Sequence, residues 1–287
     1  MAGSYPTTRM CDGELLAMFE PTTRDSDVFI STSAKCGQTW LQSLLFHLKT
    51  GGREPDFRGV GLGGVSPWLE LPNTMSFGSS WSTREERLAQ FEALDDPRVF
   101  KLHVVWDEIP RPAGSPAKIM TVTRDPRDVP YSMFSHLMSM NLPEGEGPPD
   151  DFDLYFEQWM DFGFYYKFLQ SFWPHKDDED VLFLRFADMK RDLRGQIARI
   201  LEFLAWEVSS EVIERIVPLV DINRMRETEK STILTNQASW KNDRHFFREG
   251  AIGKNAARLS DDQRRRVIER LHAELPPDCC AFVTGTD

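Results

Sequence analysis

The most constraining feature of the sequence is AKIMTVT (117–123), a run of almost continuous apolar and β-branched residues. A strand of this composition is typical of a parallel sheet, because helices cover both faces of such a sheet. Similar short runs occur at 27–32, 98–105 and 180–186, and segments with helical spacing of apolar residues lie between them. This alternation predicts an α/β fold in which right-handed crossovers build a central parallel sheet flanked by helices, as in P-loop-like proteins.

Length and charge narrow the classes of function. No internal repeat or linker divides the 287 residues, so we expect one domain over residues 1–287. A net charge of −11 argues against a nucleic-acid partner, although a small anion responds to local potential. No stretch approaches the roughly 20 apolar residues of a membrane span, and the N-terminus lacks the pattern of a secretory signal. Because the four cysteines have no metal-binding spacing, we expect a reduced cytoplasmic enzyme without a metal.

The segment STSAKCGQTW (31–40) joins the first predicted strand to the helix that follows it. In a parallel sheet this loop lies at the carboxyl edge, where backbone amides and the positive helix end favour an anion. Gly37 allows close approach of the backbone, Lys35 supplies a charge and Thr39 can donate a hydroxyl. A plain turn with a solvated lysine is the structural alternative.

Spacing weakens two other interpretations of this loop. A Walker loop requires G-x-x-x-x-G-K-[ST], but Lys35 precedes the only glycine of the loop. A phosphatase with Cys36 as its nucleophile usually has an arginine six residues later, and that residue is Gln42. We therefore interpret Cys36 as a small loop residue.

Lys101 and His103 lie two residues apart in VFKLHVV, so both point to the same face of the predicted strand. A lone histidine there could be a satisfied core residue, but burying a lysine beside it is unfavourable. His103 can accept a proton near neutral pH, and Lys101 can stabilise developing negative charge. The pair suits transfer of a group to a hydroxyl.

Arg124 ends the third predicted strand and faces the same edge as Lys35. The residues after it have structural explanations: Asp125 is a good helix cap, Pro126 fits the first turn and Asp128 favours the positive helix end. Arg124 has none, and its guanidinium can bind a phosphate with two parallel N–H groups. We therefore predict a second anion contact at Arg124.

These segments resemble sulfotransferases that use 3′-phosphoadenosine 5′-phosphosulfate (PAPS). The loop is similar to the family's 5′-phosphosulfate loop, Tyr-Pro-Lys-Ser-Gly-Thr-Thr-Trp; Lys35, Gly37, Thr39 and Trp40 match it, and Cys36 and Gln38 replace a serine and a threonine. Arg124, Asp128 and Ser132 fit the 3′-phosphate motif Arg-x-x-x-Asp-x-x-x-Ser, although Pro130 is expected to kink this helix. Lys101-Leu102-His103 is similar to Lys-Thr-His of the cytosolic-type branch, which makes His103 the base.

Two later segments extend the resemblance. FFREGAIGKN (246–255) is similar to the family's Phe-x-Arg-Lys-Gly segment, with matches at Arg248 and Gly250 and with Glu249 in place of the lysine. FADMKRD is similar to Tyr-Glu-Asp-Met-Lys-x-Asp, and Phe186 replaces a tyrosine that often contacts adenine. The resemblance thus implies PAPS as the donor, with His103, Lys35 and Lys101 as catalytic residues. The implied donor contacts are Lys35, Cys36, Gly37, Gln38, Thr39, Trp40, Arg124, Ser132, Phe186, Arg248, Glu249 and Gly250.

The acceptor and the assembly are less constrained by the sequence. Gly/Pro/Trp-rich loops at 59–82 and an aromatic helix predicted at 152–173 favour a small apolar acceptor such as a phenol, an alcohol or a lipid. The family's dimer motif falls at 254–263, where Arg258, Leu259 and Gln263 replace its Thr, Val and Glu, so this motif is poorly matched and a homodimer stays an open alternative. A P-loop-like small-molecule kinase and a non-catalytic adenosine-nucleotide-binding protein stay as alternatives.

Overall fold

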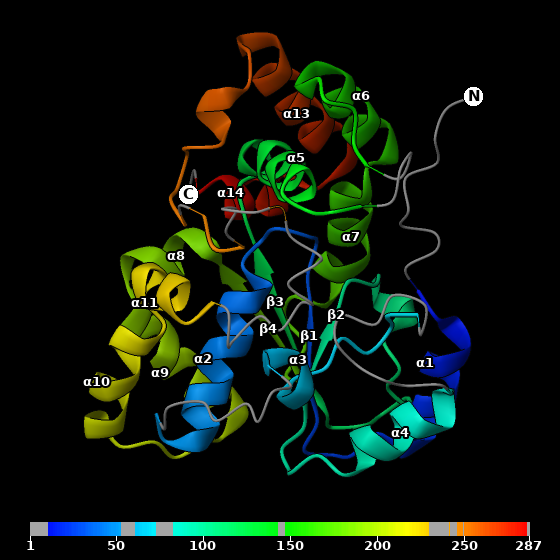
Figure 1. The fold of residues 1–287 in the computed structure, drawn as a ribbon, viewed down its shortest axis with the longest axis vertical. Helices are drawn as coiled ribbons and strands as arrows, with labels where there is room; N and C mark the ends of the chain where they lie inside the picture. The colour runs from blue at the N-terminus through cyan, green and yellow to red at the C-terminus, as the bar shows by residue number, and fades with distance from the viewer. Residues whose placement is uncertain are drawn as a thin grey trace.

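A computed structural model describes residues 11–52, 61–72, 83–142, 147–229, 241, 246–248 and 250–285 of the chain. Within these residues four parallel strands form one sheet in the order β2-β1-β3-β4 (Figure 1). The strands are β1 (Val28–Ser31), β2 (Val99–Leu102), β3 (Lys118–Thr123) and β4 (Val181–Arg185). The predicted α/β fold with a central parallel sheet is confirmed.

Helices cover both faces of the sheet, which explains the continuous apolar runs of its strands. Phe29 and Ile119 pack into the core on one face, whereas Ile30 and Met120 pack into the core on the other. The second core is closed by α2 (Gln38–Thr50), α8 (Phe186–Arg191), α9 (Leu193–Leu204) and α10 (Ser210–Leu219), with α11 (Ile222–Glu227) beyond α10. The first is closed by α1 (Gly13–Phe19), α4 (Arg84–Glu92), α5 (Val129–Met138), α6 (Phe152–Phe162), α7 (Phe164–Phe172), α13 (Asp261–Glu274) and α14 (Pro277–Thr284).

The strand order creates a switch point between β1 and β3. The chain leaves β1 toward β2 on one side of the sheet, and it leaves β3 toward β4 on the other side. The carboxyl ends of two neighbouring strands whose connections diverge form a crevice, which is where open α/β sheets bind ligands. The loop with Lys35 follows β1 and Arg124 follows β3, so the topology brings them to this crevice.

Two local predictions are wrong. The aromatic segment 152–173 forms two helices, because the chain turns at Gly163, where φ is +60° and a Cβ atom would collide with the guanidinium of Arg270. Pro130 does not kink a helix interior, since a 3₁₀ turn at Pro126–Asp128 precedes α5 and places Pro130 in the first turn of α5. Asp125 caps that 3₁₀ turn by accepting a hydrogen bond from the Arg127 N–H.

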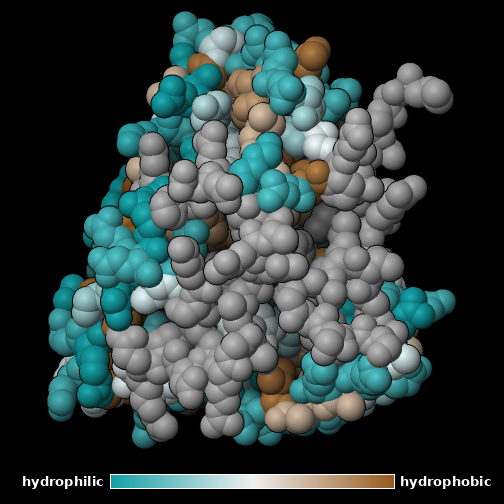
Figure 2. Space-filling model, viewed as in Figure 1, coloured by the Kyte–Doolittle hydropathy of each residue, from teal (hydrophilic) through white to brown (hydrophobic). Residues whose placement is uncertain are grey.

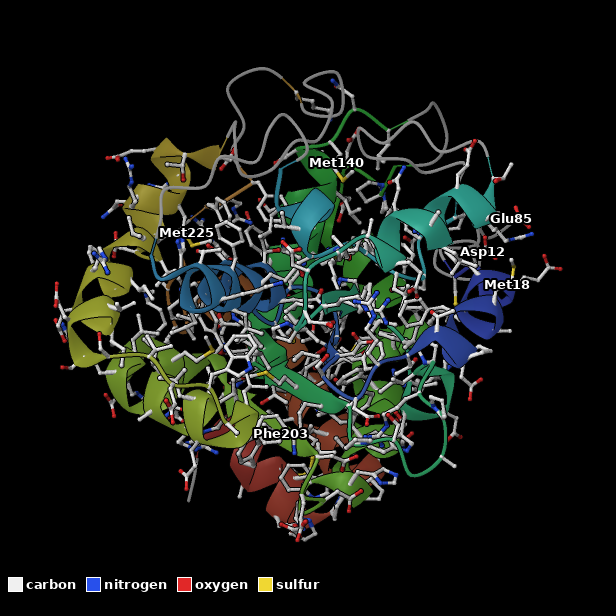
Figure 3. All side chains as sticks on the ribbon, turned by 90° about the horizontal axis from the view of Figure 1, so that it is seen from below. Asp12, Met18, Glu85, Met140, Phe203 and Met225 are labelled. Atoms are coloured by element: carbon white, nitrogen blue, oxygen red, sulfur yellow. The ribbon has the colours of Figure 1, made fainter. Side chains whose placement is uncertain are left out.

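The flank beyond β2 is closed by α1 and α4, which lie side by side (Figures 1 and 3). Asp12 caps α1 through the Leu15 N–H and also pairs with Arg84 of α4 at 2.9 Å. Helix α4 begins with a capping box formed by Thr83 and Glu86. Of the loops predicted at 59–82, the structure describes 61–72, which contain a short helix, α3 (Gly61–Val65), packed on α2.

The described surface is mainly hydrophilic in the view of Figure 2, in particular over α10 and α11. Large hydrophobic side chains with substantial exposure in the described residues are Met18, Leu154 and Ile252, which lie in separate elements. Across the same residues, the helices are too short or too polar for a bilayer crossing.

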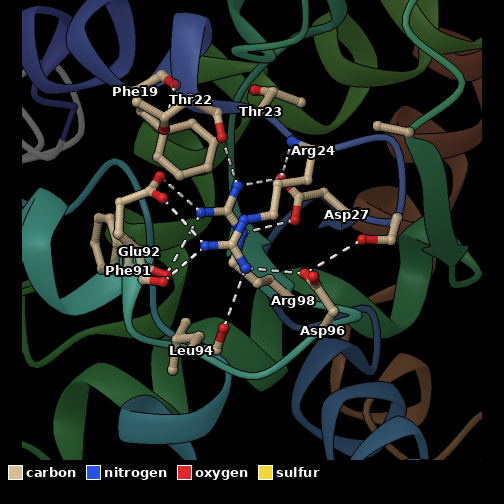
Figure 4. Close-up of polar contacts among 12 residues, drawn as sticks. Phe19, Thr22, Thr23, Arg24, Asp27, Phe91, Glu92, Leu94, Asp96 and Arg98 are labelled. Atoms are coloured by element: carbon tan, nitrogen blue, oxygen red, sulfur yellow. Dashed lines mark hydrogen bonds and ion pairs between the residues drawn. The ribbon is translucent and has the colours of Figure 1, made fainter.

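A buried ion pair holds the amino edge of the sheet, opposite the switch point (Figure 4). Arg98 and Asp27 precede β2 and β1, both side chains have no exposed surface, and two hydrogen bonds of 2.8 and 2.6 Å join them. Arg98 also donates to the carbonyl of Thr22 and pairs with Glu92. Because both members of the Arg98–Asp27 pair are buried, loss of Asp27 leaves a buried guanidinium whose remaining counter-charge is the half-exposed Glu92.

We expect Asp27→Ala to lower the free energy of unfolding by about 3–5 kcal/mol. Asp96→Ala is the matched control, because Asp96 pairs with Arg24 at the half-exposed rim of the same cluster and should change stability by about 0–1 kcal/mol. Urea denaturation followed by circular dichroism measures both variants. Equal effects of the two substitutions would contradict this account of the cluster.

Candidate active site

The loop between β1 and α2 has a strained, compact backbone. Lys35 has a positive φ of +66°, and Gly37 has a φ of +113°. A Cβ atom at Gly37 would lie 2.9 Å from the ring of Phe186, so both the conformation and the packing require glycine here. The loop therefore brings its backbone close to the start of α2, as the sequence predicts for an anion-binding loop.

The two positions at which this loop departs from the family pattern are buried. The Gln38 side-chain amide donates to the carbonyls of Ile30 and Leu102 at 2.7 Å each, so it ties the end of β1 to the end of β2. Burial raises the pKa of the Cys36 thiol to about 12. A thiol that stays protonated is a poor nucleophile, which favours our interpretation of Cys36 as a small loop residue.

Two lysines face aromatic rings in the site. The Lys101 amino group lies 3.9 Å from the ring centroid of Trp68, and that of Lys35 lies 5.1 Å from the ring centroid of Phe246. Burial lowers the pKa of Lys35 to about 7, and the positive charges of Lys101 and two arginines add to this effect. Burial likewise lowers the pKa of Lys101 to about 8. Among the described residues, burial therefore outweighs the stabilisation of these ammonium groups by negative side chains, and a bound anion would stabilise them.

His103 is held in one tautomer by the loop after β1. Its Nδ1 lies 2.7 Å from the carbonyl oxygen of Thr32, which can only accept, so Nδ1 carries the hydrogen and Nε2 carries the lone pair. Burial lowers the pKa of His103 to about 3, and the charges of Lys101 and Lys35 contribute, whereas the bond to Thr32 opposes the shift. The imidazole is thus neutral at physiological pH and presents an acceptor nitrogen.

Two further titratable residues join this cluster, and the sequence did not single them out. The Glu70 carboxylate accepts the backbone N–H of His103 at 2.6 Å, and burial raises the pKa of Glu70 to about 7. His136 of α5 packs its ring 5.3 Å from that of Phe246. Burial, with the charges of Lys35 and other basic groups, places the pKa of His136 well below its usual value. For His136 one sequence signal was available: it lies four residues after Ser132, which places both side chains on the same face of a helix.

Arg124 bridges the loop after β1 and a segment far downstream. Its Nη2 donates to the carbonyl of Ala251 at 3.0 Å, and its Nη1 donates to the carbonyl of Lys35 at 3.4 Å. The guanidinium lies 4.7 Å from the ring centroid of Phe186. Its Nε is buried and has no hydrogen-bond partner among the described residues. A buried donor without an acceptor is unfavourable, so this atom indicates a place for a ligand oxygen.

The other predicted donor contacts surround this arginine. Ser132 is buried on α5, and Arg248 lies 6.0 Å from the ring of Tyr131 on the same helix. Trp40 donates to the carbonyl of Val220 and meets the Phe186 ring edge to face at 5.6 Å. Gly250 adopts a positive φ of +57°, and Glu249 lies outside the described residues. The structure thus gathers Lys35, Cys36, Gly37, Gln38, Lys101, His103, Arg124 and Arg248 around the carboxyl ends of β1, β2 and β3, with Trp40 and Phe186 packed beside the loop.

The aromatic segment 152–173 serves mainly as core. Tyr155, Phe156 and Phe168 are buried in the first core. Tyr165 has a direct connection to the site, since its hydroxyl donates to the backbone carbonyl of Arg124 at 2.6 Å. Helix α7 therefore supports the backbone at Arg124. Nowhere in the described ranges do three or more His, Cys, Asp or Glu side chains gather as they would around a metal ion.

Comparison with known proteins identifies related chains. The model of a family described as sulfotransferase domain matches residues 25–275. The chain is 27% identical to amine sulfotransferase of Oryctolagus cuniculus over 88% of this chain and 81% of that protein. It is 26% identical to sulfotransferase 1A1 of Rattus norvegicus over 90% of this chain and 87% of that protein.

Solved structures show the same fold. Mouse sulfotransferase SULT7A1 complexed with PAP matches with a TM-score of 0.72 at 20% identity and covers 96% of this chain and 95% of its own. Retinol dehydratase in complex with androsterone and the inactive cofactor PAP matches with a TM-score of 0.67 at 21% identity, over 89% of this chain and 82% of its own. These matches agree with the parallel sheet and with the helices on its two faces.

Proposed function

The chain belongs to the sulfotransferase family, and we propose that it transfers the sulfonate group of PAPS to a hydroxyl group of a small acceptor. The observation that carries this proposal is the state of His103. Its Nδ1–H is tied to the Thr32 carbonyl, so a neutral Nε2 is available as a base in a cluster with Lys35 and Lys101. Transfer to a hydroxyl needs a base and positive charge in one place.

The residues of the site fit the donor. Lys35 and the amides of residues 36–39 would hold the 5′-phosphosulfate, while Arg124, Ser132, Arg248 and the backbone at Gly250 would hold the 3′-phosphate. The Nε of Arg124 has no hydrogen-bond partner among the described residues and supports this assignment, because a phosphate oxygen would accept its hydrogen. Trp40 and Phe186, whose rings pack together, would lie near the adenine. When bound, PAPS would supply an activated sulfonate group for the acceptor oxygen, with PAP as the leaving group.

The protein's own groups would perform the remaining chemistry. His103 takes the hydroxyl proton at Nε2, and Lys35 and Lys101 stabilise the negative charge that develops on the oxygens around them. Burial and, after it, the lysine charges hold the pKa of His103 low, so a bound anion that offsets those charges would raise the pKa and make the imidazole a stronger base. Positioning and electrostatics supply the catalysis, as in phosphoryl transfer.

The surroundings of the base favour a small apolar or aromatic acceptor, such as a phenol, an alcohol or a lipid. Trp68 meets the His103 ring edge to face at 5.2 Å, and Phe246 lies between Lys35 and His136. Aromatic walls around a few polar groups are typical of sites for small organic ligands. Transfer of ³⁵S from labelled PAPS to panels of phenols, alcohols and amines tests this proposal. No transfer to any hydroxyl acceptor would contradict it.

The pKa values of the lysines predict how donor binding depends on pH. We expect affinity for 3′,5′-adenosine bisphosphate (PAP) to fall as pH rises from about 6.5 to 9, because Lys35 and Lys101, with pKa values of about 7 and about 8, lose their charges. Each can weaken binding up to about tenfold per pH unit above its pKa. Isothermal titration calorimetry measures this, with Lys35→Arg as the comparison, since arginine stays charged and should flatten the profile. Equal affinity at both pH values would contradict the assignment.

A kinase and a non-catalytic nucleotide-binding protein are the alternatives. A kinase would need the Gly-Lys-[ST] arrangement and Mg²⁺, and the loop at 31–40 lacks that arrangement. Calorimetric measurement of the affinities for PAP and for MgATP distinguishes a sulfotransferase from a kinase, because a kinase should bind MgATP more tightly. A protein that binds PAP without transferring ³⁵S from PAPS to any acceptor would be a binding protein.

A further inference from the structure

Asp128 makes an unusual set of contacts that its place in the 3₁₀ turn does not explain. Its Oδ2 accepts the backbone N–H of Gly253 at 2.8 Å, and its Oδ1 accepts those of Asn255 and Ala256 at 3.0 and 2.9 Å. The carboxylate is buried. One side chain therefore binds three amides of a segment that lies more than 120 residues later in the chain.

The segment 250–256 needs such a partner because its backbone is irregular. Gly250 and Gly253 have φ values of +57° and +76°, and a 3₁₀ turn begins only at Ala256. Amides before the first turn of a helix have no partner within it and require one from elsewhere. Asp128 supplies it in the manner of a helix cap, but from a distant element.

Arg124 holds the same segment from its other end. Its Nη2 donates to the Ala251 carbonyl and lies 3.5 Å from Asp128 Oδ2. Arg124 and Asp128 thus bind a carbonyl and three amides of one segment, and they fix its position relative to the loop after β1. Arg124 is also the residue with the buried, unpartnered Nε that indicates a phosphate.

We propose that Asp128 is a positioning residue for donor binding: it holds the segment 250–256 in the conformation that completes the 3′-phosphate site. The inference rests on the proposed function and adds a role for a residue of the same charge as the ligand. A carboxylate beside a phosphate site opposes anion binding by simple electrostatics, so its presence requires another benefit. The benefit is a fixed conformation of the segment 250–256, which the three hydrogen bonds to backbone amides and the contact with Arg124 provide.

Electrostatics and positioning predict opposite results for Asp128→Asn. The substitution removes a negative charge, which alone would tighten binding of PAP. It also places an amide NH₂ group against backbone N–H donors, so at least one of the three hydrogen bonds is lost in either orientation of the amide. If Asp128 positions the segment, affinity for PAP should fall by at least about tenfold.

Calorimetry with two nucleotides separates this role from general destabilisation. Adenosine 5′-phosphosulfate lacks the 3′-phosphate, so its affinity should change by less than about threefold while that of PAP falls. Asp125→Asn is the matched control, since it removes the same charge from the same turn, and in the described part of the chain the Asp125 carboxylate accepts hydrogen bonds only from Arg127. Unchanged or tighter PAP binding in Asp128→Asn, or equal loss for both nucleotides, would overturn the inference.

Hydrogen exchange tests the contact in the unsubstituted protein, should the variant fail to fold. The amides of Gly253, Asn255 and Ala256 should exchange slowly even without nucleotide, because Asp128 already binds them, and PAP should slow them further. Exchange as fast as that of exposed amides, with no response to PAP, would overturn the inference. Failure of the unsubstituted protein to bind PAP would instead contradict the proposed function, whereas slow exchange without nucleotide would still support the Asp128 contact.

Discussion

Replacement of His103 by glutamine is expected to lower kcat by about 10²–10⁴-fold while affinity for PAP stays within about threefold of the original. Glutamine can still donate a hydrogen bond to the Thr32 carbonyl, so the geometry of the loop is kept. It cannot take up a proton, so the acceptor hydroxyl loses its base. Turnover is measured by ³⁵S transfer from PAPS, and affinity by calorimetry with PAP.

The control for this variant is His175→Gln. His175 stacks on Trp106 at 3.7 Å between ring centroids and pairs with Asp178, and we assign it no part in the site. Its replacement should leave kcat unchanged within error. If His103→Gln retained near-normal turnover, or if it lost PAP binding and turnover together, the assignment of His103 as the base would fail.

The sheet could be predicted because its signals are local. AKIMTVT is apolar or β-branched at every position but Lys118, and its neighbours Ile119 and Met120 face different cores, as do Phe29 and Ile30 of β1. The break between α6 and α7 could not be predicted in the same way. The helical pattern continues through Gly163, and the turn there depends on Arg270, which arrives from α13 more than 100 residues later.

In the site, too, some residues follow from local sequence patterns and others depend on contacts between distant segments. Lys35 and Arg124 each follow a predicted strand, so topology alone places them at one edge. Lys101 and His103 lie within the strand predicted at 98–105, and the structure places them at its carboxyl end because β2 ends at Leu102. Their roles stay predictions. Glu70 contacts a residue 33 positions away, and Asp128 contacts a segment more than 120 positions away. No local sequence pattern predicts either contact. The sequence explained Asp128 as a favourable residue near a helix end, whereas its hydrogen bonds go to a different segment.

Replacement of Lys35 by methionine is expected to lower kcat by about 10²–10³-fold, comparable to the loss of one donor to developing negative charge in an oxyanion hole. Methionine keeps the unbranched side chain and meets the same backbone restriction at φ +66°, so the variant removes the charge with little change of conformation. Affinity for PAP should also fall, because the Lys35 ammonium is destabilised by desolvation and by the positive charges of Lys101, Arg124 and Arg248, and a bound anion would offset this effect.

Lys49→Met is the control for the loss of a lysine charge away from the site, since Lys49 lies in the last turn of α2 and donates to the carbonyls of Asp95 and Pro97. Steady-state kinetics with labelled PAPS should show no change in kcat for this variant. The pH profile adds a second test. The charge of Lys35 is lost above a pKa of about 7 unless an anion holds it, so Lys35→Met should remove the fall in PAP affinity that begins near pH 7 and keep the fall due to Lys101, which begins near pH 8. If Lys35→Met bound PAP with the original pH profile, Lys35 would not be the residue that holds the donor, and Lys101 would be the group that responds to pH.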